Sequence, residues 1–88
     1  MPKFQLLLPK MGESVEEATI ISWLKNIGDK VEIDDLIVEI ATDKVDSEIP
    51  TEVSGVLIEK LYKINDVVKV GQPLAIIETD ELIKNELN

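Results

Sequence analysis

One lysine occupies a position where a side chain could be used for chemistry. Lys44 lies within Thr42-Asp43-Lys44-Val45, between two segments in which aliphatic and polar residues alternate. Such alternation is typical of strands with one face in a core, so these four residues are predicted to form a hairpin turn. A lysine at a turn is usually only solvated. It can also be a handle to which an enzyme attaches a cofactor through an amide bond.

Other kinds of chemistry lack the residues that they need. The chain has 88 residues but no histidine and no cysteine, which excludes the common catalytic triads, dyads and zinc sites. Its four glycines are scattered and form no phosphate-binding loop. Asp43, Asp46 and Glu48 lack the spacing of a calcium-binding loop. We therefore predict no catalytic residue, no metal site and no enzyme that acts alone.

The composition is that of one small acidic domain. Nine basic and eighteen acidic residues give a formal net charge of −9, which repels phosphate backbones and argues against nucleic-acid binding. No apolar run approaches the roughly 18 residues of a membrane span, and the first residues resemble neither a signal nor a transit peptide. The absence of cysteine fits a reducing compartment. We expect a soluble, intracellular domain with no membrane partner.

Eight strands and no helix are predicted from the alternation and the turn residues. The aliphatic side chains, mostly isoleucine, leucine and valine, are numerous enough to fill a β core. Residues 1–80 are predicted to form the domain and residues 81–88 a flexible tail or the start of a linker. The predicted strands span residues 4–8, 18–24, 31–33, 38–40, 45–49, 55–62, 68–70 and 74–79.

The second half of the chain repeats the first. A shift of 37 places gives eight identities over residues 18–44, among them Ile40 with Ile77 and Thr42 with Thr79. The repeat predicts an all-β fold, a flattened eight-stranded barrel-sandwich of two four-stranded sheets with quasi-two-fold symmetry.

The repeat also predicts where the loop after the first strand lies. Residues 4–9 align with residues 45–50 at a shift of 41, which leaves four extra residues between Pro9 and Ala18. The symmetry predicts that residues 10–17, the opening loop, lie at the same end of the sandwich as Lys44. The second copy of the turn has Glu81 in place of the lysine.

These residues resemble a known family over about residues 2–80. The chain is similar to the lipoyl domain of the dihydrolipoamide acyltransferase (E2) component of 2-oxo acid dehydrogenase complexes. Thr42-Asp43-Lys44-Val45 matches the lipoylation motif of the family, and Gly28 and Gly55 stand at its usual glycine positions. The turn at residues 68–74 matches as well. Residues 9–15 look like the opening loop of 2-oxoglutarate and branched-chain types more than that of pyruvate types. The chain departs from frequent family glycines at Ala18, Asp34 and Asn65.

The resemblance implies a carrier function. Lys44 would hold lipoate in amide linkage, and Asp43 and Val45 would flank it for recognition by lipoate ligase or octanoyltransferase. The thiamine diphosphate enzyme E1 would reductively acylate the arm, the E2 catalytic domain would pass the acyl group to coenzyme A, and the dihydrolipoamide dehydrogenase E3 would reoxidise the dithiol. The part of the opening loop expected to contact E1 comprises Met11, Gly12, Glu13, Ser14 and Val15.

The same resemblance implies a non-catalytic, monomeric domain of an acyltransferase parent. Its compartment would be the bacterial cytoplasm, or the mitochondrial matrix in a eukaryote. A branched-chain 2-oxo acid is favoured over 2-oxoglutarate on the motif from Asp43 to Glu48. Three alternatives share the architecture. A biotinyl domain has methionines beside its lysine, a glycine-cleavage H protein is longer and partly helical, and a structural module of membrane adaptors needs no tip lysine.

Overall fold

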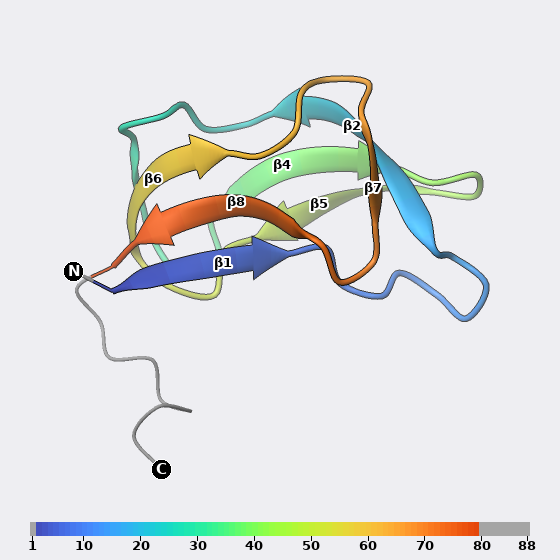
Figure 1. The fold of residues 1–88 in the computed structure, drawn as a ribbon, viewed down its shortest axis with the longest axis horizontal. Coiled ribbons are helices and arrows are strands. Elements are labelled where there is room, and N and C mark those ends of the chain that lie inside the picture. Colours follow the sequence, from blue (N-terminus) through green and yellow to red (C-terminus); the bar gives the residue numbers. More distant parts are fainter. Residues whose placement is uncertain (1, 80–88) are drawn as a thin grey trace, which may run out of the picture.

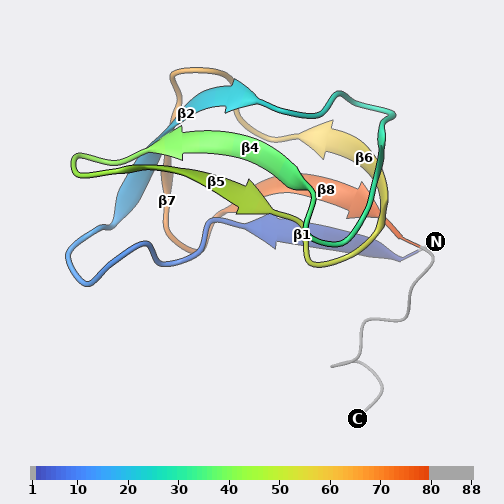
Figure 2. The ribbon, with the colours of Figure 1, turned by 180° about the vertical axis from the view of Figure 1, so that it is seen from behind.

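The computed structural model describes residues 2–79, which form two antiparallel four-stranded sheets packed face to face (Figures 1 and 2). One sheet has the strand order β1-β8-β6-β3 and the other β5-β4-β2-β7. No helix within these residues is long and apolar enough to span a membrane. The strands are β1 (Lys3–Leu7), β2 (Glu17–Trp23), β3 (Lys30–Val31), β4 (Leu36–Ala41), β5 (Asp46–Pro50), β6 (Gly55–Lys60), β7 (Val67–Lys69) and β8 (Pro73–Glu78).

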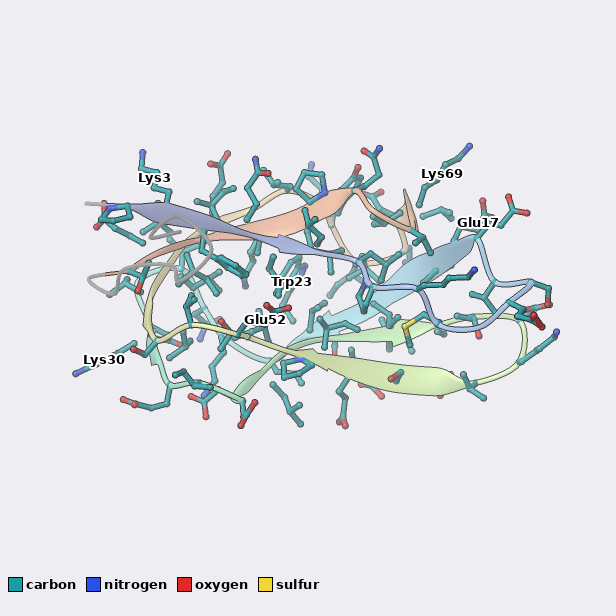
Figure 3. All side chains as sticks on the ribbon, turned by 90° about the horizontal axis from the view of Figure 1, so that it is seen from below. Lys3, Glu17, Trp23, Lys30, Glu52 and Lys69 are labelled. Atoms are coloured by element: carbon teal, nitrogen blue, oxygen red, sulfur yellow. The ribbon has the colours of Figure 1, made fainter. Side chains whose placement is uncertain are left out.

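The aliphatic faces of the strands fill the space between the two sheets. Ile20 and Ile40 are paired neighbours in one sheet, Leu57 and Ile77 in the other, and all four are fully buried. Burying side chains of this size stabilises the fold by about 1.5–3 kcal/mol each. Charged side chains lie outside the sandwich, as Lys3 and Lys69 show in Figure 3. In the alternating segments of the sequence, the aliphatic residues therefore face the core and the polar residues face solvent.

The all-β fold and all eight predicted strands are confirmed, with every strand end within two residues of its predicted position. Val45 was included both in the predicted turn and at the start of the predicted strand 45–49, and 52% of its surface is exposed. Strand β5 begins only at Asp46, so Val45 belongs to the turn that projects beyond both sheets.

The predicted quasi-two-fold symmetry is confirmed by the strand order. Exchanging β1 with β5, β2 with β6, β3 with β7 and β4 with β8 turns one sheet into the other. The turns follow the same rule: Gly28 and Asn65 form one symmetric pair with positive φ, and Asp34 and Gly71 form another. Asp34 (φ 76°) and Asn65 (φ 79°) thus adopt the left-handed conformation that glycine favours and that Asp and Asn tolerate in turns.

The shift of 41 between the first strand and its symmetry mate is wrong. Phe4 pairs with Ile77 in one sheet, and Ser47 pairs with Ile40 in the other. Because Ile77 and Ile40 are mates at the shift of 37, Phe4 and Ser47 are also mates. Their separation is 47 − 4 = 43 residues.

The corrected shift lengthens the extra segment of the opening loop. Leu8 and Thr51 donate equivalent backbone hydrogen bonds of 2.9 Å, to Gln72 and Asp35 respectively. The chain therefore has 43 − 37 = 6 extra residues before Ala18, instead of the four predicted. A slip of two residues keeps each side chain on the same face of a strand, so the sequence pattern alone could not reveal it.

Pro2 and Thr79, the first and last residues that the structure describes, lie next to each other. They occupy the position that is related by the quasi-two-fold symmetry to the 42–45 turn. The backbone N–H of Thr79 donates to the carbonyl of Pro2 at 3.0 Å, just as Thr42 donates to Val45 at 2.8 Å. This junction lies at the opposite end of the molecule from the 42–45 turn (Figure 1). Glu81, the counterpart of Lys44, and the tail predicted for residues 81–88 lie outside the described residues.

Candidate functional site

Strands β4 and β5 present Lys44 on a short projecting turn, residues 42–45, which we call the hairpin tip (Figure 2). The last strand pair before it is Ala41 with Asp46. The tip closes with the backbone hydrogen bond from Thr42 N–H to the carbonyl of Val45. Asp43, Lys44 and Val45 are all exposed, so the lysine side chain is accessible from outside.

The hydroxyl of Thr42 fixes the backbone of the tip. It accepts hydrogen bonds from the N–H groups of Lys44 at 3.2 Å and Val45 at 3.1 Å, and it donates to the Val45 carbonyl at 3.1 Å. A threonine that opens a turn often bonds the N–H groups two and three residues further on. That signal was available in the sequence, but Thr42 was not predicted as a site residue.

The opening loop lies beside the hairpin tip, as the symmetry predicted. Lys44 Nζ donates a hydrogen bond to Ser14 Oγ at 3.0 Å, across 30 residues of sequence. Within the described part of the chain, no carboxylate forms an ion pair with Lys44. The lysine nitrogen therefore contacts an uncharged hydroxyl although Asp43 and Asp46 are its near neighbours in sequence.

The opening loop is fastened at both ends and at one point inside. Gly71 N–H donates to the Leu8 carbonyl, and Val70 N–H donates to the Glu16 carbonyl, each at 2.9 Å. Met11 is partly buried against the core, so its side chain mainly anchors the loop. Glu17 was predicted in the loop but is the first residue of β2.

Between these anchors the loop exposes a short apex. Gly12, Glu13 and Ser14 are exposed, Val15 is half-buried, and Val15 N–H donates to the Gly12 carbonyl at 3.3 Å. Of the five residues predicted to contact a partner, these four are accessible in whole or in part. Their role in partner binding stays a prediction.

A solvent-open cleft of about 610 Å³ separates the opening loop from the hairpin tip. Its walls come from the end of the loop, the start of β2 and the end of β4. The lining residues are Ser14, Val15, Glu16, Glu17, Ala18, Thr19, Ala41, Thr42 and Asp43.

This arrangement suits attachment of a group better than catalysis. Nothing in the sequence supplies a histidine or cysteine, and no group of three acidic side chains in residues 2–79 could hold a metal ion. What the tip offers is one accessible amine on a backbone held by Thr42. A separate enzyme can reach such an amine and join it to a carboxyl group.

A small symmetric β-sandwich that presents a lysine on a hairpin tip defines the class of covalent cofactor carriers. The family model described as "Biotin-requiring enzyme" matches residues 5–77, and the chain belongs to this biotinyl and lipoyl family. Among solved structures, the lipoyl domain of the 2-oxoglutarate dehydrogenase complex from Azotobacter vinelandii is 36% identical, with a TM-score of 0.67. The match covers 85% of this chain and 96% of that domain, so the chain is a lipoyl domain.

Curated relatives are components of three kinds of dehydrogenase complex. The acetyltransferase component of the Corynebacterium glutamicum pyruvate dehydrogenase complex is 49% identical over 93% of this chain. The succinyltransferase component of the Staphylococcus saprophyticus 2-oxoglutarate dehydrogenase complex is 44% identical over 83%. The lipoamide acyltransferase component of the Bacillus subtilis branched-chain complex is 41% identical over 86%. This chain spans only 12%, 17% and 18% of these relatives.

The comparisons confirm the predicted family and the E2-type carrier module, which is itself non-catalytic. A urea carboxylase from Kluyveromyces lactis, 22% identical with a TM-score of 0.76 over 89% of this chain and 6% of that one, shares the fold alone. The relatives include pyruvate-type proteins, so the sequence of the opening loop does not by itself identify the 2-oxo acid.

Thr42→Val is expected to loosen the hairpin tip without unfolding the domain. The substitution removes three hydroxyl contacts while keeping the side-chain shape, and it should cost about 1 kcal/mol of unfolding free energy. Amide hydrogen exchange at Lys44 and Val45 should accelerate, because both N–H groups lose their acceptor. Urea unfolding and exchange measured by NMR provide the readouts. Thr42→Ser keeps the hydroxyl and serves as the control, and equal losses in both variants would contradict the assignment.

Proposed function

We propose that Lys44 carries lipoate through an amide bond and that the domain is the swinging-arm carrier of an E2 acyltransferase. The observation that carries this proposal is the exposed lysine on a hairpin tip fixed by Thr42, within a lipoyl domain. Asp43 and Val45 flank the lysine and would be read by a lipoate ligase or octanoyltransferase. When bound, lipoate would supply a dithiolane that can be reductively acylated and, after acyl transfer, a dithiol that can be reoxidised.

The partners follow from the complexes that the relatives are named for. An E1 dehydrogenase would load the arm, the E2 catalytic domain would unload it to coenzyme A, and E3 would reoxidise it. The exposed part of the opening loop, Gly12, Glu13 and Ser14, lies beside Lys44 and would be contacted by E1 together with the tip. Because the lysine projects beyond both sheets, a partner can enclose the tip without disturbing the core.

Biotin is the competing cofactor, since the matching family model covers both kinds of carrier. Asp43 and Val45 stand where biotinyl domains place methionines, which favours lipoate. The lipoyl domain that resembles this chain is also more similar in sequence, at 36%, than the carboxylases with the same fold, at 22% and 13%.

Mass spectrometry tests the proposal directly. Incubating the 88-residue chain with lipoate ligase, ATP and lipoate is expected to add one lipoyl mass, and peptide mapping should place it on Lys44 alone. A parallel incubation with biotin ligase, ATP and biotin is expected to add nothing. Biotin incorporation, or a lipoyl group on Lys60 or Lys63, would contradict the proposal.

The parent complex and its compartment are part of the same proposal. We propose a branched-chain 2-oxo acid as the substrate of the partner E1, and bacterial cytoplasm as the compartment, or mitochondrial matrix for a eukaryotic source. The curated relatives described above are bacterial. Reductive acylation of the lipoylated, monomeric domain by the three E1 types should be fastest with the branched-chain enzyme. A higher kcat/KM with either other E1 would overturn that choice.

A further inference from the structure

Two hydroxyl groups bind Lys44, one at its backbone N–H and the other at its side-chain Nζ. Thr42 Oγ1 accepts from the backbone N–H of Lys44, and Ser14 Oγ accepts from its Nζ at 3.0 Å. We propose that Ser14 is a positioning residue for the carrier arm: it binds Nζ of Lys44 both as an ammonium and after that nitrogen has become an amide. The second half of this inference rests on the proposed function.

The chemistry of the nitrogen permits both contacts. On modification, Nζ bonds to the activated carboxyl carbon of the lipoyl donor, and the activating group supplied by the ligase leaves with the bonding electron pair. The nitrogen releases two of its three protons to solvent and keeps one N–H. A serine hydroxyl can accept a hydrogen bond from either form, whereas a carboxylate partner would favour the charged form. Ser14 is therefore a suitable acceptor throughout.

The opening loop can hold Ser14 in place because it is fastened independently of the lysine. Its ends are bonded to Val70 and Gly71, and Met11 packs against the core in between. Ser14 lies within the turn closed by the hydrogen bond from Val15 N–H to the Gly12 carbonyl. The opening loop is six residues longer than its symmetry mate. This extra length brings a hydrogen-bond acceptor, the Ser14 hydroxyl, to the end of the domain that carries the hairpin tip.

If Ser14 holds Nζ of Lys44, the flexible part of the lipoyl-lysine arm begins at the amide and not at the lysine Cα. If the single amide N–H points toward Ser14, the carbonyl oxygen of the planar trans amide points the opposite way, and the lipoyl chain extends from the carbonyl carbon, trans to Cε of the lysine. The arm then pivots at the amide, and the lysine methylenes stay close to the domain surface. Because both residues are exposed, the contact is a modest one and should be visible as a shift in population.

NMR of the whole chain with ¹⁵N-labelled lysine tests this inference in both forms. In lipoylated Ser14→Ala, exchange of the Nζ–H with water is expected to rise roughly two- to five-fold, with greater nanosecond motion of the N–H bond. Ser14→Thr should restore the wild-type values because it keeps the hydroxyl. Ser47→Ala, on β5 and not hydrogen-bonded to the lysine, is the matched control. In the unmodified domain the ammonium signal, assigned by its absence in Lys44→Arg, should respond in the same way.

Unchanged exchange in Ser14→Ala, or an equal effect in Ser47→Ala, would overturn the inference in the form examined. Failure of the proposed function looks different. The wild-type domain would then show no lipoyl amide signal after treatment with the ligase, while the ammonium signal would still report whether Ser14 holds the nitrogen.

Discussion

Lys44→Arg is expected to abolish lipoate attachment and leave the domain folded. A guanidinium stays protonated and delocalised, so it is not acylated where the lysine amine would be. Lys44 is exposed and its Nζ donates a hydrogen bond to the hydroxyl of Ser14, which an arginine can also reach. The free energy of unfolding should therefore change by less than about 0.5 kcal/mol. Intact mass after treatment with the ligase and thermal unfolding are the two measurements.

The matched control for that substitution is Lys63→Arg. Lys63 is also an exposed lysine, and it lies in the loop between β6 and β7, residues 61–66. This variant should accept one lipoyl group as completely as the wild type. A residual mass increase in Lys44→Arg would place the attachment elsewhere. Loss of modification in Lys63→Arg would show that the ligase requires more of the surface than the hairpin tip.

Gly55→Ala is expected to be the most destabilising of the substitutions considered. A Cβ atom at Gly55 would lie 2.1 Å from the backbone oxygen of Glu78 and 3.0 Å from Cα of Thr79. Strand β8 is hydrogen-bonded on both sides, to β1 and β6, so its backbone cannot move away. We expect a loss of about 3 kcal/mol. For a domain of this size that corresponds to a melting temperature lower by roughly 12–24 °C.

Gly12→Ala is the control for Gly55→Ala. Its added Cβ would lie 3.5 Å from a methyl group of Val15, an ordinary contact, so stability should change by about 0.5 kcal/mol or less. Thermal and urea unfolding of both variants provide the comparison. Wild-type stability in Gly55→Ala would mean that β6 and β8 are not packed as closely as described. The symmetry mate of Gly55 is Ala18, which follows the longer loop and has its side chain buried in the core.

The strands and the sandwich could be predicted because they depend on local alternation and on the repeat. Period-two patterns determine which side chains face the core, and the identities between Ile40 and Ile77 or Thr42 and Thr79 report the duplication. The pairing of β1 could not be predicted in the same way. Pro9 and Pro50 suggested a shift of 41, and the true shift of 43 leaves every residue on the same face.

The site was predicted in its location but not in its contacts. The symmetry placed the opening loop at the lysine end, and the sequence motif identified Lys44. The bond between Ser14 and Lys44 depends on the path of a loop whose extra length was itself underestimated. The sequence assigned Val45 to both the turn and the following strand, because alternation does not determine the residue at which a strand begins.

The meeting of Pro2 and Thr79 at the end away from Lys44 has a consequence for reach. The longest dimension of the domain is 36 Å, and the junction and the hairpin tip lie at opposite ends along it (Figure 1). A flexible linker would need about 40 residues to spread over the same distance. The folded domain thus acts as a rigid extension of any linker joined at that junction. It places Lys44 at the end of the domain that is farthest from the linker.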